Sequence, residues 1–174
     1  MDEKLVAYLE KMIDPDEKEA YYFADKLGEK ADEEVKDKLL VLLRGDHWEH
    51  AYLASRALAK SPFKEEGLEA TIEAVFDKKF KSVQGAFAQV LELYNLEFKF
   101  VDILKIYLFG NFKASQLAEG YLNEVEFDIS PRTIRKAEKH WNHYLHNPED
   151  DGSLQIKKDF VEPILLEMKD LFSE

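Results

Sequence analysis

The chain has 174 residues, with 24 Lys and Arg against 36 Asp and Glu, so its formal net charge is −12 at pH 7. With 45% hydrophobic residues it is too apolar for a disordered polyelectrolyte, and no stretch reaches the roughly 20 apolar residues of a membrane-spanning helix. The lack of cysteine excludes disulfides, a thiolate nucleophile and cysteine zinc sites, and together with the charged residues after Met1 it predicts a cytoplasmic protein without a secretory leader.

Apolar residues recur at spacings of three and four along the chain and almost never alternate, which is the period of an α-helix. The few Gly and Pro residues stand where helices would end: Gly28, Gly45 and Gly110 follow apolar runs, and Ser130-Pro131 is typical of a helix start. The sequence therefore predicts an all-α protein.

An internal repeat of about 31 residues is the most informative feature of the sequence. Each repeat carries four small or apolar residues at i, i+3, i+4 and i+7, here called the anchors. They are Ala20, Phe23, Ala24 and Leu27; Ala51, Ala54, Ser55 and Leu58; Val83, Ala86, Phe87 and Val90; and Ala114, Leu117, Ala118 and Tyr121. This register predicts a right-handed α-α superhelix (solenoid) of about five helix pairs, with an irregular helical bundle as the alternative.

The pattern resembles the HEAT-like (armadillo-type) helical repeats, in the short form of bacterial members. One helix turns through Asp14-Pro15-Asp16 into a second that ends at Leu27-Gly28, and the run from Leu39 through Gly45-Asp46 to Leu58 repeats this arrangement. The period is shorter than the roughly 40 to 47 residues usual for the class. The Val-Arg pair that commonly opens the second helix in this class is absent. The resemblance covers about residues 4–125 and implies a scaffold that binds partner proteins on the concave side, which the second helices line.

The chain is expected to form a single domain, residues 1–174, with four helix pairs over about 2–126 and a capping helix pair over about 130–173. One long helix is predicted at 131–146, with Ile134, Ala137, Trp141 and Leu145 on its core face. A second helix is predicted at 154–172, where Pro163 should kink or restart it.

The face of each second helix opposite the anchors is the first candidate binding surface, here called the ridge. Its predicted partner-binding residues are Tyr22, Asp25, Glu49, Leu53, Arg56, Lys81, Phe112, Gln116 and Glu119, with Lys18, Gly85 and Ala88 at the remaining positions. Exposed apolar groups among charges of both signs favour a protein or peptide partner. The alternative is an ordinary solvated surface.

The helix at 131–146 carries the second candidate surface, here called the basic patch. It comprises Arg132, Lys136, Lys139, His140 and His143, flanked by Arg135 and His146. It could be a solvated face paired with the acids at 149–151, or a site for an anion or an acidic partner. The His140, His143 and His146 series and the His47–His50 pair could also hold a metal, but three histidines at this spacing turn through about 120° and do not converge. We predict no metal and no cofactor.

Enzyme motifs are absent: the sequence has no Gly-rich phosphate loop, no Gly-x-Ser-x-Gly and no His-Glu-x-x-His. We therefore predict a non-catalytic scaffold or adaptor that binds a protein. Two alternatives stay open: an acidic antagonist of a basic protein, and a HEAT-fold enzyme that uses a metal or resembles DNA glycosylases, with Trp48, Trp141, Asp46 and Asp151 as its candidate residues. The carboxylates on the ridge would repel phosphate groups, so nucleic acid is not expected as a partner. Among the aromatic residues at 94–112, Phe98, Phe100 and Phe112 are expected to be exposed.

Overall fold

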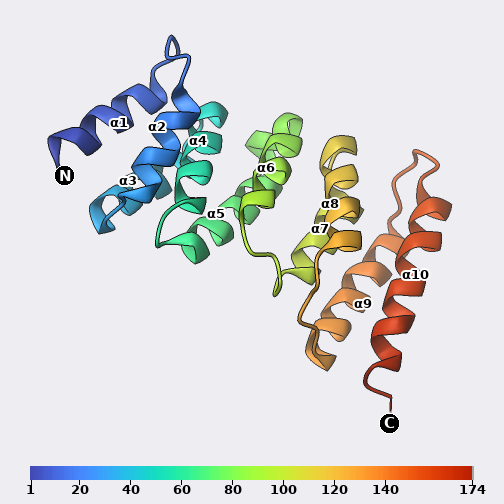
Figure 1. Ribbon diagram of the computed structural model, residues 1–174. Coiled ribbons are helices and arrows are strands. Elements are labelled where there is room, and N and C mark those ends of the chain that lie inside the picture. Colours follow the sequence, from blue (N-terminus) through green and yellow to red (C-terminus); the bar gives the residue numbers. More distant parts are fainter. Residues whose placement is uncertain (174) are drawn as a thin grey trace. The chain divides into compact units, whose positions relative to one another are not determined.

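The computed structural model describes residues 1–173, and within that range it contains ten α-helices, two short 3-10 helices and no strand, which confirms the all-α prediction (Figure 1). The helices are α1 (Glu3–Ile13), α2 (Ala20–Glu29), α3 (Glu33–Leu43), α4 (Trp48–Ala59), α5 (Lys64–Phe76), η1 (Lys78–Val83), α6 (Gln84–Val90), η2 (Leu91–Leu93), α7 (Phe100–Phe109), α8 (Phe112–Glu124), α9 (Pro131–His146) and α10 (Leu154–Asp170).

The chain divides into two compact units. The N-terminal unit comprises residues 1–95 and 111–114, and the C-terminal unit comprises residues 96–110 and the chain from 115 onward. The division falls inside α8, whose first three residues belong to the N-terminal unit.

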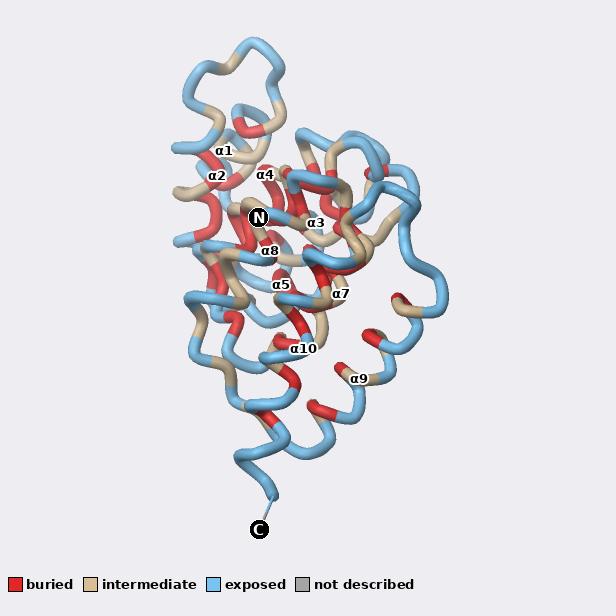
Figure 2. The backbone as a smooth tube through the Cα atoms, turned by 90° about the vertical axis from the view of Figure 1, so that its right-hand side faces the viewer, coloured by how far each residue is buried: buried red, intermediate tan, exposed pale blue. Residues whose placement is uncertain are grey.

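The N-terminal unit is built around α4, which packs against α2, α3, α5 and α6. Because α4 has neighbours on several sides, more than half of its residues are buried. None of the sixteen anchors is exposed, and Ala24, Ala51 and Ala54 are fully buried. In Figure 2 the buried positions recur as short segments along the helices, between exposed ones. Eleven of the sixteen anchors are buried and the other five are half-buried, so the anchors lie on the inward side of their helices.

Helices α2 and α4 approach each other unusually closely, and Gly28 makes this possible. A Cβ atom at Gly28 would lie 2.1 Å from the carbonyl oxygen of Ala57, a backbone atom that cannot move aside. The close approach brings residues 31 positions apart into contact: the rings of Tyr21 and Tyr52 lie 5.8 Å apart, and Asp25 pairs with Arg56. At this pair of helices, equivalent repeat positions lie side by side.

Buried polar groups in the N-terminal unit are satisfied by one another. The hydroxyl groups of Ser55 and Thr71 lie 2.5 Å apart, and the Tyr94 hydroxyl donates a 2.6 Å hydrogen bond to the Ser55 carbonyl. Gln84 donates to the carbonyl of Val75 and accepts from the backbone N–H of Asn111. No buried side-chain nitrogen or oxygen of residues 1–173 lacks a partner, so the core carries little desolvation penalty.

In the C-terminal unit, α9 packs against α7 and α10. Helix α9 has the predicted bounds, and Ser130 and Thr133 form a capping box at its start. The core face differs at one position: Tyr144 is fully buried, whereas Leu145 is only half-buried. Tyr144 is preferred because its ring stacks on Trp141 and its hydroxyl reaches Ser153, so a large apolar ring is buried without losing its polar end.

Lys157 is a buried cation that the sequence did not single out. Its Nζ donates a 3.0 Å hydrogen bond to the carbonyl oxygen of Leu108, in the last turn of α7, and lies near the rings of Tyr107 and Tyr144. A cation at a helix C-terminus satisfies a carbonyl left without an intrahelical partner and complements the helix dipole. Lys157 thereby links α10 to α7.

Two further sequence predictions can be compared with the structure. Helix α10 runs as one helix from Leu154 to Asp170 with the exposed Pro163 inside it, so no new helix starts there. The prediction that Phe100 is exposed was wrong. Phe100 is 3% exposed because it packs edge-on against Phe127. Phe98 and Phe112, at 69% and 79%, are exposed as expected.

Gly28→Ala should destabilise the protein by about 1–3 kcal/mol, because the added methyl group overpacks the contact between α2 and α4. The measurement is guanidinium unfolding followed by circular dichroism. Gly120→Ala in α8 is the matched control: its Cβ would meet nothing within 4 Å, so the change should stabilise by up to about 1 kcal/mol. Equal effects of the two substitutions would contradict the close approach.

Candidate binding groove in the N-terminal unit

At the middle of the predicted ridge, the structure buries residues that were predicted to be exposed. Leu53 is only 8% exposed, and α6 packs against α4. Gly85 and Ala88 are also buried, and the Lys113 side chain lies against Gly85. Tyr22, Glu49, Lys81, Phe112, Gln116 and Glu119 are exposed, and Asp25 and Arg56 are half-buried. Gln116 and Glu119 belong to the C-terminal unit, so the predicted residues are divided between the two units.

Asp25 and Arg56, both predicted ridge residues, form a two-pronged ion pair. The Arg56 Nε and Nη2 atoms each donate a 2.8 Å hydrogen bond to one oxygen of the Asp25 carboxylate. The guanidinium group also lies over the Tyr21 ring, 4.8 Å from its centre. Asp25 raises the pKa of Arg56 mainly through this hydrogen bond. Both side chains are thus committed to holding α2 against α4.

Next to this pair lies an open hollow of about 380 Å³, here called the groove. All the residues that line it belong to the N-terminal unit. They are Met12, Ile13, Asp14, Pro15, Glu17, Ala20, Tyr21, His47, Trp48, Glu49, His50, Tyr52, Leu53, Ala86, Gln89 and Lys113. Two of them, Glu49 and Leu53, were predicted ridge residues.

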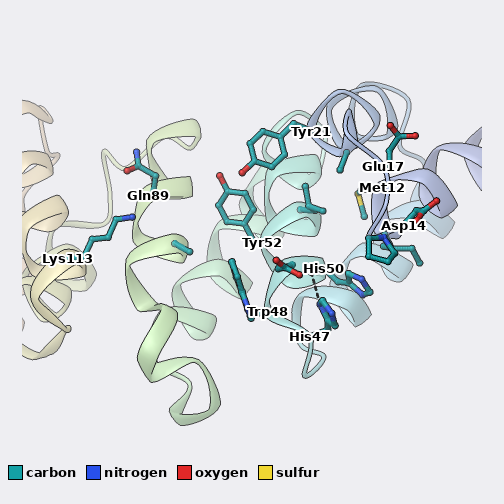
Figure 3. A pocket seen from close by; sticks show the side chains of 16 residues that line it. Met12, Asp14, Glu17, Tyr21, His47, Trp48, His50, Tyr52, Gln89 and Lys113 are labelled. Carbon is teal, nitrogen blue, oxygen red and sulfur yellow. Dashed lines mark hydrogen bonds between the residues drawn. The ribbon is translucent and has the colours of Figure 1, made fainter.

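Aromatic side chains occupy the middle of the groove (Figure 3). Trp48 and Tyr52 stand one turn apart on α4, and Tyr21 of α2 lies beside Tyr52. Trp48 is 39% exposed and Tyr21 is 53% exposed, so both offer apolar surface to a ligand. Burial, with the Tyr21 hydrogen bond, raises the pKa of Tyr52 to about 12, so its hydroxyl stays neutral.

The charged side chains of the groove come from three parts of the N-terminal unit. Asp14 and Glu17 come from the turn between α1 and α2, whereas Lys113 of α8 and the uncharged Gln89 of α6 line the opposite side of the groove (Figure 3). Glu49 adds a third carboxylate at the start of α4. The groove therefore carries three acids and one lysine around an aromatic centre.

His47 and His50 lie against each other, with ring centres 3.8 Å apart. His47 caps α4, because its Nδ1 accepts a hydrogen bond from the backbone N–H of His50. Burial, and then the neighbouring His47, lower the pKa of His50. Within residues 1–173, no group of three or more His, Asp or Glu side chains is placed to hold a metal ion.

The basic patch lies on α9 in the C-terminal unit. Arg132, Lys136, Lys139 and His143 are exposed, as are the flanking Arg135 and His146, whereas His140 is half-buried. Burial and the cations Lys105 and Lys139 lower the pKa of His140. Asp151, one of the acids expected to pair with the patch, accepts a hydrogen bond from the backbone N–H of Ser153.

The residues considered for a glycosylase-like enzyme do not share one site. Trp48 lies in the groove, but Trp141 is buried against Tyr144 in the C-terminal unit. Asp46 is fully exposed beside Lys79. The Trp141 indole is thus a core group and is not available to insert into a duplex.

The aromatic centre of the groove was not predicted from the sequence. Tyr21 and Tyr52 follow the first anchor of their repeats, at the same 31-residue spacing, and that recurrence was the available signal. Trp48 had no such signal, because its role depends on the space that α6 leaves in front of α4.

The chain matches no protein-family model, no curated protein and no solved structure. Within residues 1–173, no helix combines the length and the apolar character needed to cross a bilayer.

The lowered pKa of His50 predicts that the protein loses stability as the pH falls from 7.5 to 5.5. The unfolded chain takes up the proton near pH 6.5, before the folded protein does, so protonation favours unfolding. His50→Gln should make the unfolding midpoint in urea less dependent on pH over this range. His146→Gln, at an exposed site on α9, is the control and should keep the wild-type dependence; an unchanged slope in His50→Gln would contradict the prediction.

Proposed function

We propose that this protein is a non-catalytic binding module that holds a partner protein in the groove of its N-terminal unit. The observation that supports this proposal is the aromatic centre of the groove. Trp48 and Tyr21 stand partly exposed over an apolar floor that includes Met12 and Leu53. Tryptophan and tyrosine in such hollows are the residues that most often dominate the energy of protein–protein contacts.

The proposal includes a stacked, HEAT-like solenoid as the architecture that presents this groove. The support is local: α2 and α4 place equivalent positions side by side, and the anchors are buried or half-buried. In such a stack the second helices form a shared surface, and α2, α4, α6 and the start of α8 all contribute to the groove. A cytoplasmic location stays a prediction from the sequence.

An acidic antagonist is the second candidate function. It is favoured by the net charge of −12 and by the three carboxylates at the groove. Such a protein would neutralise a basic partner, and the groove would still be the contact surface. The same carboxylates disfavour a nucleic-acid enzyme, because phosphate contacts dominate the affinity for DNA.

Site-specific photo-crosslinking tests the proposed function. The photoreactive amino acid p-benzoylphenylalanine is placed at Trp48 in the full chain, which is expressed in the organism that encodes it. We expect a discrete crosslinked product that contains a second protein, identified by mass spectrometry.

The matched control places the same group at Val41, which is 72% exposed on α3 and does not line the groove. Position 41 should give no such product. Absence of a protein adduct at position 48, or equal adducts at both positions, would refute the groove as the partner site.

A further inference from the structure

The groove combines two features that select one kind of ligand. Its centre is aromatic, and its charged groups are three carboxylates against one lysine. The Glu49 carboxylate is exposed and forms no hydrogen bond or ion pair with residues 1–173. Cations bind to the faces of aromatic rings, with tryptophan the strongest, and to carboxylates.

The N-terminal unit already uses this chemistry beside the groove. Arg56 lies over the ring of Tyr21 while it pairs with the carboxylate of Asp25 through two hydrogen bonds. Arginine suits such a place because its flat guanidinium stacks on a ring and still donates to a carboxylate. Trp48 and Glu49, which are consecutive residues at the start of α4, also supply an aromatic ring and a carboxylate, and both line the open groove.

We propose that the groove binds an arginine side chain of a basic peptide segment in the partner protein. The guanidinium lies on the exposed face of Trp48 and is neutralised by Glu49, while apolar neighbours of the arginine cover the floor around Leu53. This inference rests on the proposed function and names the chemistry of its partner. The acids repel phosphate groups, so nucleic acid is not the occupant.

The test uses defined peptides. Random 12-residue peptides displayed on phage are selected on the full-length protein, and the best ones are synthesised with arginine and with citrulline, its uncharged counterpart. Selected peptides should contain arginine flanked by apolar residues. Citrulline should weaken binding about tenfold, because it removes the charge that the ring and the carboxylate recognise.

Variants of the protein test which residues of the groove recognise the arginine. Glu49→Gln should weaken binding of the arginine peptide about threefold, as expected for the loss of one exposed charge pair. The affinity for the citrulline peptide should stay unchanged. Trp48→Ala should abolish binding of both. Glu10→Gln on α1, an exposed acid outside the groove, is the matched control and should bind like the wild type.

The outcomes separate this inference from the proposed function. Equal binding of arginine and citrulline peptides, or no selected peptide at all, overturns the arginine site, even where position 48 crosslinks to a protein. If a 20-base-pair DNA duplex displaces the peptide, the arginine site is overturned in favour of nucleic acid. If the protein self-associates and Trp48→Ala abolishes this, the arginine site is overturned in favour of a second copy of the chain. The proposed function itself fails when position 48 gives no protein adduct, or when positions 48 and 41 give equal adducts.

Discussion

The close approach of α2 to α4 is the constraint on which the N-terminal unit depends. It requires a residue without a side chain at Gly28, because the Ala57 carbonyl occupies the space of a Cβ atom. Once the two helices are this close, Tyr21 meets Tyr52 and Asp25 meets Arg56. These contacts fix the rotation of each helix about its axis. They leave the aromatic faces of Tyr21 and Trp48 directed to the groove rather than to the core.

The charges of the protein have different roles according to their burial. Lys157 and Arg56 are held by specific oxygen atoms and act on the fold. The exposed residues of the basic patch and the carboxylates of the groove contribute little to stability, since exposed charges are well solvated. Their effect is on encounters with other molecules, where a local excess of one sign selects partners of the other. The two surfaces lie in different units and have opposite sign.

Much of the fold could be predicted from the spacing of residues. The burial of Ala24, Ala51 and Ala54 and the bounds of α9 follow from the helical period and from the Ser130-Pro131 start. The candidate site was harder, because exposure on a helix depends on its neighbours as well as on its own sequence. Leu53 lies opposite the anchors and was predicted to be exposed, yet α6 covers it. Phe100 and Leu145 were misplaced for the same reason: a neighbouring ring, Phe127 or Tyr144, decides which side chain is buried.

The sequence by itself determined that the protein is helical, where α9 begins and ends, and which small residues face the core. These features depend on contacts between residues three or four positions apart, which the order of residues fixes. Only the tertiary structure decided that α4 is surrounded, that Leu53 is covered, and that Trp48, Tyr21 and three carboxylates meet in one groove. Those features bring together residues as far apart in the sequence as Met12 and Lys113, and they depend on the distances between the helices. That distance is controlled by side-chain volume at contacts such as Gly28 with Ala57, which the helical period does not reveal.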